Sequence, residues 1–169
     1  MTLLTPLRTR GLALALAIFA IDRVVKWYLT GPMDLAFQGP FHILPIFAFR
    51  YTENFGVSLG MFTATSAVMR YGLIAVTGGI AIGVLVWMLR EKGWGEICGL
   101  ALILGGAMGN IWDRAVSGFV IDYADLHFGE WRPFLIFNLA DAAITFGVLI
   151  LLARSLLLRE KPSPSGQGA

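Results

Sequence analysis

Residues Tyr71–Leu89 read YGLIAVTGGIAIGVLVWML and contain no charged side chain, although Arg70 precedes them and Arg90 follows. An α-helix needs about 20 apolar residues to cross the ~30 Å hydrocarbon core of a bilayer. This stretch has that length, and its charged ends lie where such a helix would reach the polar headgroups. The sequence therefore predicts a membrane-spanning helix here.

Further apolar stretches extend this prediction to the whole chain. They are Gly11–Leu29, Ile97–Trp112 and Pro133–Ala153. Together with 71–89 they predict an all-α membrane protein with four transmembrane helices, folded as one domain over residues 1–169. Residues 162–169 read PSPSGQGA, and we expect them to form a disordered tail.

The composition excludes several classes of protein. Hydrophobic residues make up 57% of the chain and charged residues 14%, with a mean hydropathy of +0.73, whereas soluble domains average about 45–50% apolar and about 25% charged. A net charge of +2 with scattered basic residues argues against binding to nucleic acid. The single cysteine, Cys98, excludes an internal disulfide, and two histidines cannot form a typical zinc site on their own.

Lysines and arginines that flank the spans predict their orientation, because positive residues concentrate on the cytoplasmic side. The side shared by both termini holds Arg8, Arg10, Arg90, Lys92, Arg154, Arg159 and Lys161, and the other side holds Arg50, Arg70, Arg114 and Arg132. We therefore expect both termini in the cytoplasm. Residues 30–70 and 113–132 are then expected on the extracytoplasmic side.

Both outer connections contain segments typical of β-strands. Ile46–Tyr51 alternates an aromatic face with a mixed one, and Phe119–Tyr123 is a second short β-prone run. Thr52–Gly56 reads as a turn. Because aromatic side chains favour the membrane–water interface, these segments predict a small platform at the membrane surface.

Asp141 is the first candidate for chemistry. It is the only charged residue in Pro133–Ala153 and lies about 12 Å along the predicted helix. An aspartate at bilayer depth costs about 2.5–3.5 kcal/mol on insertion scales, so it needs a reason. The functional interpretation is a buried ionisable group facing the outer end of the bundle, and the alternative is a polar contact that holds helices together.

Asp122 is the second candidate, because Val120, Ile121 and Tyr123 around it predict burial. If its loop folds back over the bundle, Asp122 can meet Asp141. Two carboxylates about 3 Å apart share one proton, and such a pair can act as general base and general acid on a peptide bond. Asp125, three residues further along, is the competing partner.

Other polar residues accompany the predicted helices. Asp22 and Lys26 are spaced as an i,i+4 ion pair, for which we expect a structural role, because a paired acid is a poor general base. Gly105 and Gly109 have the spacing that lets membrane helices approach closely. Three further side chains are expected near the outer end of the bundle: Asn110, Arg114 and Asn138.

Motifs of other protease classes are missing from the chain. It contains no His-Glu-x-x-His sequence for zinc and no Gly-x-Ser-x-Gly sequence for a nucleophilic serine. Among the protease mechanisms, the sequence therefore leaves one that uses aspartates.

Four motifs, in this order, resemble the lipoprotein signal peptidase family, and the resemblance covers roughly residues 11–152. They are Asp22–Trp27 (DRVVKW), Asn54–Phe62 (NFGVSLGMF), Gly105–Arg114 (GGAMGNIWDR) followed by Gly118–Tyr123 (GFVIDY), and Phe137–Ile144 (FNLADAAI). Tyr123 departs from the family, in which phenylalanine is commoner at this position.

The resemblance implies an aspartic endopeptidase of the bacterial cytoplasmic (inner) membrane, with its active site near the outer face. Its substrates would be prolipoproteins that already carry diacylglycerol, and it would remove the signal peptide by cleaving on the N-terminal side of the lipidated cysteine. Asp122 and Asp141 match the family's catalytic pair. We therefore expect a hydrolase that uses no metal or other cofactor and that globomycin-type cyclic peptides inhibit.

The resemblance also implies a fold and a set of supporting residues. An extracytoplasmic β-cradle and a short amphipathic helix would accompany the four spans, and the chain is expected to be a monomer among membrane lipids. Asn54, Asn110, Arg114 and Asn138 match polar residues that line the family's substrate pocket, while Asp22 and Lys26 match structural positions.

Two alternatives from other classes stay open. A small proton- or cation-coupled carrier could use Asp141 and the Asp22–Lys26 pair as a relay, although four spans without an evident inverted repeat fit alternating access poorly. A purely structural membrane subunit is the other, and it would tolerate Asn at position 141.

Overall fold

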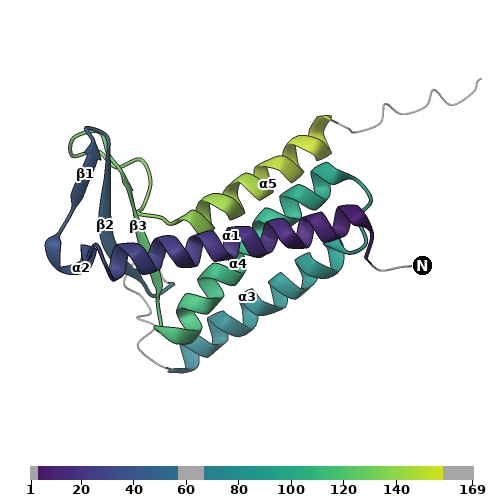
Figure 1. The fold of residues 1–169 in the computed structure, drawn as a ribbon, viewed down its shortest axis with the longest axis horizontal. Coiled ribbons are helices and arrows are strands. Elements are labelled where there is room, and N and C mark those ends of the chain that lie inside the picture. Colours follow the sequence, from purple (N-terminus) through teal and green to yellow (C-terminus); the bar gives the residue numbers. More distant parts are fainter. Residues whose placement is uncertain (1–3, 57–66, 158–169) are drawn as a thin grey trace, which may run out of the picture.

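The computed structural model describes residues 4–56 and 67–157 of the chain. The helices are α1 (Pro6–Thr30), the single-turn α2 (Leu35–Gln38), α3 (Ala67–Met88), α4 (Trp94–Val116) and α5 (Leu139–Leu157). The strands are β1 (Phe41–Leu44), β2 (Phe47–Asn54) and β3 (Val120–Leu126). The four long helices form a bundle with the small sheet at one end, and the start of α1 and the end of α5 both lie at the opposite end (Figure 1).

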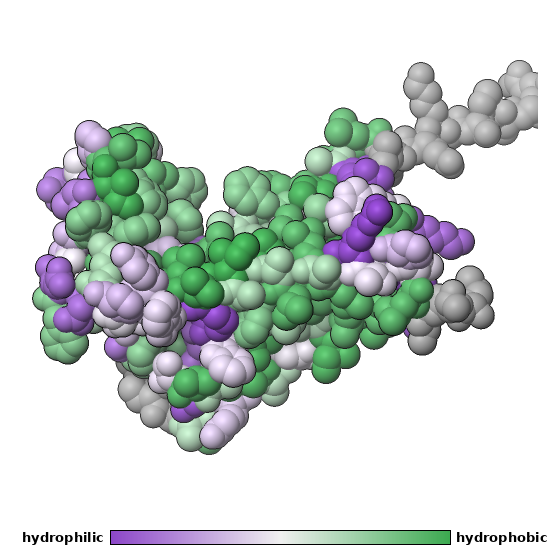
Figure 2. Space-filling view, in the orientation of Figure 1, coloured by the Kyte–Doolittle hydropathy of each residue, from purple (hydrophilic) through white to green (hydrophobic). Residues whose placement is uncertain are grey.

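Three of the long helices, α3, α4 and α5, are long and apolar enough to cross a membrane. Helix α1 has 25 residues, but Asp22, Arg23 and Lys26 interrupt its apolar run. Apolar side chains cover much of the flank of the bundle in Figure 2, as expected for helices that face lipid. The predicted spans near 71–89, 97–112 and 133–153 therefore have counterparts, whereas a fourth span depends on how α1 accommodates its charges.

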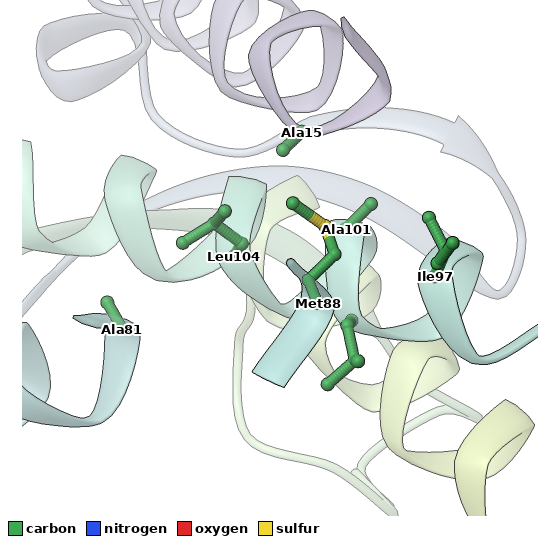
Figure 3. Packing of buried hydrophobic residues seen from close by; sticks show 7 residues of the cluster. Ala15, Ala81, Met88, Ile97, Ala101 and Leu104 are labelled. Carbon is green, nitrogen blue, oxygen red and sulfur yellow. The ribbon is translucent and has the colours of Figure 1, made fainter. Parts of the chain in front are cut away.

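Helix α4 packs between the other helices through its apolar and small residues. Its Ile97, Ala101 and Leu104 belong to a buried cluster with Ala15 of α1 and with side chains of α3 (Figure 3). The cluster therefore ties α1, α3 and α4 together in the part of the bundle that lies away from the sheet and at its centre.

Glycines of α4 allow the helices to approach closely. A Cβ atom added at Gly105 would lie 2.5 Å from the backbone oxygen of Ala15, and one added at Gly109 would lie 2.6 Å from Oδ2 of Asp22. Such distances leave no room for a side chain. The close packing predicted from Gly105 and Gly109 is confirmed, and it is α1 that approaches them.

The sheet is antiparallel, with strand order β1-β2-β3. The strands predicted within 46–51 and 119–123 are confirmed as parts of β2 and β3. The turn predicted at Thr52–Gly56 is wrong in its first half, because residues 52–54 continue β2 and pair with residues 120–122 of β3. Strand β1 was not predicted, since Pro40 and Pro45 frame it closely and its register against β2 is irregular.

Several predicted helix boundaries move by a few residues, and two of these shifts affect the candidate site. Helix α5 begins at Leu139 rather than Pro133, because Phe137 instead forms backbone hydrogen bonds with Ala124 of β3. Helix α4 continues beyond Trp112 to Val116, so the first residues of the predicted outer connection 113–132 are helical. Charged residues do not end α4 because Asp113 is buried and ion-paired.

Some expectations fall outside the described residues. These are the tail at 162–169 and the part of the second motif that covers 57–62. The expected short amphipathic helix has one candidate between residues 4 and 56, the single turn α2, which buries Leu35 and leaves Phe37 88% exposed.

Candidate active site at the junction of the sheet and helix α5

Asp141 lies in the first turn of α5, where it takes part in the cap of the helix. The backbone N–H of Asp141 donates to Asn138 Oδ1 at 2.9 Å, and the backbone N–H of Asn138 donates to Asp141 Oδ2 at 3.3 Å. This reciprocal pattern is a capping box. The prediction that Asp141 lies about 12 Å along its helix is therefore wrong, and the carboxylate sits where the helix dipole favours negative charge.

Asp122 lies on β3, with 2% of its surface exposed. Its Oδ2 accepts a hydrogen bond from Asn54 Nδ2 at 2.9 Å, and its Oδ1 accepts one from Asn138 Nδ2 at 2.6 Å. The Asn54 side chain is itself fixed, because its Oδ1 accepts from the backbone N–H of Gly56 at 2.8 Å. The last residue of β2 thus holds the carboxylate of the neighbouring strand.

Two asparagines connect Asp122 with Asp141. Asn138 bonds to both aspartates, and its Nδ2 also lies 3.3 Å from Asn110 Oδ1. Asn110, on α4, donates from Nδ2 to Asp141 Oδ1 at 2.8 Å. Each of the four carboxylate oxygens of Asp122 and Asp141 therefore accepts a hydrogen bond, and the donors come from β2, α4 and the start of α5.

Backbone pairing explains how residues so far apart in sequence meet. Phe137 donates its N–H to Ala124 O at 3.1 Å and accepts the N–H of Ala124 at 2.7 Å. The hydroxyl of Tyr123 accepts the N–H of Leu139 at 3.2 Å. These bonds join the strand that carries Asp122 to the start of the helix that carries Asp141.

The environment changes the proton affinity of Asp122. Burial raises its pKa, the hydrogen bond from Asn54 lowers it, and the charge of Asp141 raises it again, so that the pKa reaches about 6. A carboxyl group with this pKa exchanges its proton near neutral pH, which suits general acid–base chemistry.

Asp125, the competing partner in the sequence analysis, has other contacts. Its carboxylate is 1% exposed and forms ion pairs with Arg50 at 3.0 Å and with Arg132 at 3.1 Å. Two arginines thus hold Asp125, while Asp122 belongs to the asparagine cluster with Asp141.

Arg114 lies at the edge of this cluster. Its guanidinium lies close to Gly56, since a Cβ atom added there would be 3.6 Å from Arg114 Nη2. Its Nε is buried and has no hydrogen-bond partner within 4–56 and 67–157. Of the four polar residues predicted around the pair, Arg114 is therefore the one that does not contact either carboxylate through a described hydrogen bond.

A separate ionic cluster joins α1 to α4. Lys26 Nζ lies 3.0 Å from Asp22 Oδ2, which confirms the ion pair predicted from their i,i+4 spacing. The same Nζ lies 2.7 Å from Asp113 Oδ2. Arg23 bonds to both acids, at 2.8 Å and 2.6 Å. The two acids and two bases balance, which explains how α1 keeps charges in its buried face.

The roles of Asp113 and Arg23 were not predicted from the sequence. Asp113 falls in the predicted outer connection 113–132, but in the structure it is buried and also accepts the backbone N–H of Ile121 at 3.2 Å. Ile121 directly precedes Asp122, so the ionic cluster helps to fix β3. The spacing could have indicated this role. If the predicted helix 97–112 is extended by one turn, Asp113 lies on it one turn beyond Asn110 and faces the same region.

Comparison with known proteins adds independent evidence. The family described as signal peptidase (SPase) II matches residues 14–157. A lipoprotein signal peptidase of Sphingopyxis alaskensis is 50% identical over 151 residues, 89% of this chain and 87% of that protein. One of Rhizorhabdus wittichii is 46% identical over 158 residues, 94% of this chain and 92% of that protein.

Solved structures show the same fold. Two chains, both described as a bacterial membrane enzyme, superpose with a TM-score of 0.75 each. The first is 21% identical and the overlap covers 95% of this chain and 94% of that one. The second is 23% identical, with 90% and 95% covered. The sequence match and the shared fold agree, and the chain belongs to the signal peptidase II family of membrane peptidases.

Proposed function

We propose that this chain is an aspartic endopeptidase that removes the signal peptide from diacylglyceryl-modified prolipoproteins, with Asp122 and Asp141 as the catalytic pair. The observation that carries the chemistry is the cluster in which asparagine donors hold all four oxygens of the two carboxylates. The substrate class rests on the family and on its relatives, which are lipoprotein signal peptidases.

In the proposed reaction the two carboxyl groups share one proton and bind one water molecule. The ionised group takes a proton from the water, whose oxygen attacks the carbonyl carbon of the scissile bond. The protonated group gives its proton to the carbonyl oxygen. Collapse of the tetrahedral intermediate breaks the carbon–nitrogen bond, and the amino group of the lipidated cysteine leaves with a proton returned by the pair.

The asparagines act as positioning residues in this proposal. A carboxylate has about four acceptor sites, so the bonds from Asn54, Asn110 and Asn138 leave acceptor sites for the attacking water. Arg114 is the residue we assign to the substrate, because its buried Nε has no partner in the part of the chain that the structure describes. A guanidinium there can donate to a backbone carbonyl of the bound peptide.

In the proposed arrangement four helices cross the bacterial cytoplasmic membrane: α3, α4 and α5, and in addition α1. Its buried charges are compensated within the protein by Asp113 and by each other. The bundle places the sheet at the end away from the start of α1 and the end of α5 (Figure 1). With the termini in the cytoplasm, as the flanking lysines and arginines predict, the aspartates lie near the outer face.

Thiol labelling of intact cells tests this orientation. The only native cysteine is first removed by Cys98→Ser, and Glu130→Cys or Lys92→Cys is then introduced. A membrane-impermeant thiol reagent should label position 130 and spare position 92 until the cells are opened. Labelling of position 92 alone in intact cells would contradict the orientation.

The proposed activity is tested with a prolipoprotein prepared with and without diacylglycerol on its lipobox cysteine. Purified protein in detergent should release the signal peptide from the modified form only, and mass spectrometry should find the lipidated cysteine at the new N-terminus. Globomycin should inhibit, and a metal chelator should leave the rate unchanged. Ion or proton uptake by sealed vesicles, with no cleavage, would favour the carrier instead.

A further inference from the structure

A second polar cluster lies in the sheet, around Asp125. Arg50 of β2 and Arg132, in the segment after β3, bind this buried carboxylate through their Nε atoms, at 3.0 Å and 3.1 Å. Each arginine side chain remains 39% exposed, and neither uses its Nη groups in a hydrogen bond to residues 4–56 or 67–157. One acid thus orients two guanidinium groups, and the group of three keeps a net charge of +1.

The chain's two histidines lie beside this group. His42 of β1 pairs with Ala48 of β2, and Ala48 pairs with Asp125 of β3. Residues opposite one another in neighbouring strands point to the same face of a sheet, and His127 shares that face because it follows Asp125 by two. The two imidazoles meet over the small Ala48, with ring centres 5.6 Å apart.

His127 has an unsatisfied nitrogen. The residue is 8% exposed, and its Nε2 is buried without a hydrogen-bond partner among the described residues. Buried polar atoms normally find a partner in protein, solvent or ligand. The same face of the sheet therefore carries guanidinium groups with exposed donors and a buried imidazole nitrogen without a described partner, and Asp125 is already bound by both arginines.

This inventory favours an anion over a metal ion. A cation would meet the net positive charge of Arg50, Arg132 and Asp125, whereas the planar guanidinium fork matches the oxygens of a phosphate group. An Nε2–H of His127 can add a further donor. Phosphate is thus the chemical group that the donors fit.

The neighbours of Arg132 indicate where the phosphate comes from. Trp131 is 65% exposed, Phe134 61% and Leu135 78%. Trp131 is held in place by a ring contact with Phe128 at 5.6 Å and by backbone hydrogen bonds to it. Exposed aromatic residues next to an arginine are typical of the membrane–water interface.

We propose that Arg50 and Arg132, oriented by Asp125 and assisted by His127, bind the phosphate of a phospholipid headgroup, while Trp131, Phe134 and Leu135 contact the lipid around it. The site would anchor the sheet to the bilayer surface. It is independent of the proposed peptidase activity, since none of these residues contacts Asp122 or Asp141 through a described hydrogen bond.

Native mass spectrometry of the full-length protein in nonionic detergent tests the site. Phosphatidylglycerol is titrated against the wild type, against the double variant Arg50→Gln/Arg132→Gln, and against Arg154→Gln. The last is a matched control, because Arg154 forms the same kind of Nε–carboxylate pair, with Glu96 at 2.8 Å, at the other end of the bundle. Diacylglycerol with the same acyl chains and inorganic phosphate are titrated in parallel.

The proposal expects phosphatidylglycerol to bind the wild type and Arg154→Gln alike, and the double variant about tenfold more weakly. Diacylglycerol should bind more weakly than phosphatidylglycerol, and millimolar inorganic phosphate should not displace the lipid. Equal lipid binding by wild type and double variant would overturn the site. Binding of free phosphate that competes with the lipid would overturn the assignment to a headgroup.

If the double variant unfolds, His127→Ala and Arg132→Lys replace it. If the site binds a headgroup, phosphatidylglycerol should bind both folded single variants more weakly. Lys at position 132 cannot present the guanidinium fork, and Ala at position 127 removes the imidazole donor. Arginines that only brace the sheet would lower the unfolding temperature and leave lipid binding unchanged, which would refute the proposal.

Discussion

Asn138 and Asp141 cap the start of α5 together, each accepting the other's backbone N–H, at 2.9 Å and 3.3 Å. The same Asn138 side chain donates to Asp122 at 2.6 Å. One residue therefore starts the helix, orients one aspartate and contacts the other. The local geometry of a helix cap is thereby part of the candidate active site.

Substitutions at Asn138 should separate these two roles. Asn138→Ala removes the cap, which costs about 0.5–2 kcal/mol, and also removes the donor to Asp122. Asn138→Ser keeps a good capping oxygen but cannot reach Asp122 with an amide N–H. We expect a lower unfolding temperature for Ala only, and cleavage slowed about 10- to 100-fold in both variants. Full activity of Asn138→Ser would show that the contact to Asp122 is dispensable.

The pH dependence of cleavage should report the proton shared by the two carboxyl groups. The pKa of Asp122 is raised to about 6, first by burial and then by the charge of Asp141. Above that pH the pair loses its shared proton, so kcat/KM is expected to fall as pH rises through about 6. Bound substrate excludes water and raises the pKa further, so the corresponding fall in kcat should lie at higher pH.

Asn54→Ala provides the matched test of this assignment. The hydrogen bond from Asn54 lowers the pKa of Asp122, and its loss should move the alkaline fall of kcat/KM to higher pH. The pH profiles of wild type and variant are compared on the same substrate. A shift to lower pH would contradict the proposed proton location.

The ionic cluster between α1 and α4 should matter for stability more than for chemistry. Lys26→Ala leaves Asp22 and Asp113 buried with only Arg23 to balance them, and breaking a buried pair typically costs about 3–5 kcal/mol. The charge-balanced variant Asp22→Asn/Lys26→Gln should recover part of that loss. Thermal unfolding in detergent gives the comparison, and a double variant less stable than Lys26→Ala would refute the charge-balance argument.

Close helix packing at Gly109 predicts a sharp contrast between two glycines. Alanine there would place its Cβ 2.6 Å from Asp22 Oδ2 and 3.3 Å from the Cβ of Ala140. Overpacking of this kind costs about 1–3 kcal/mol, and it pushes on the residue beside Asp141. Gly79→Ala on α3 is the control, because no atom lies within 4 Å of the added Cβ. Equal unfolding temperatures for both variants would contradict the packing.

The sequence predicted the apolar helices well, because the requirement for about 20 apolar residues is local. It was less informative at their ends. Pro133–Phe137 continue the apolar run into α5, so hydropathy alone extended the helix too far. The spacing of Asn138 and Asp141 matches a capping box, which is the local signal that could have placed the start at Leu139.

The sequence also singled out Asp122 and Asp141, since apolar neighbours around an acid indicate burial. It could not identify the partners of Asp125 and Asp113, because these depend on tertiary contacts. Asp125 binds an arginine 75 residues away and Asp113 a lysine 87 residues away. Both acids fall in the predicted outer connection 113–132, where only the fold distinguishes a solvated acid from a buried one.

The most direct test of the central claim compares Asp122→Asn and Asp141→Asn with the wild type on a diacylglyceryl-modified prolipoprotein. Asp34→Asn is the control, because Asp34 makes no side-chain cap bond and its positive φ of 48° suits asparagine. The account predicts that both pair variants stay folded and do not cleave, while the control cleaves normally. Normal cleavage by either folded pair variant would contradict a catalytic pair formed by Asp122 and Asp141.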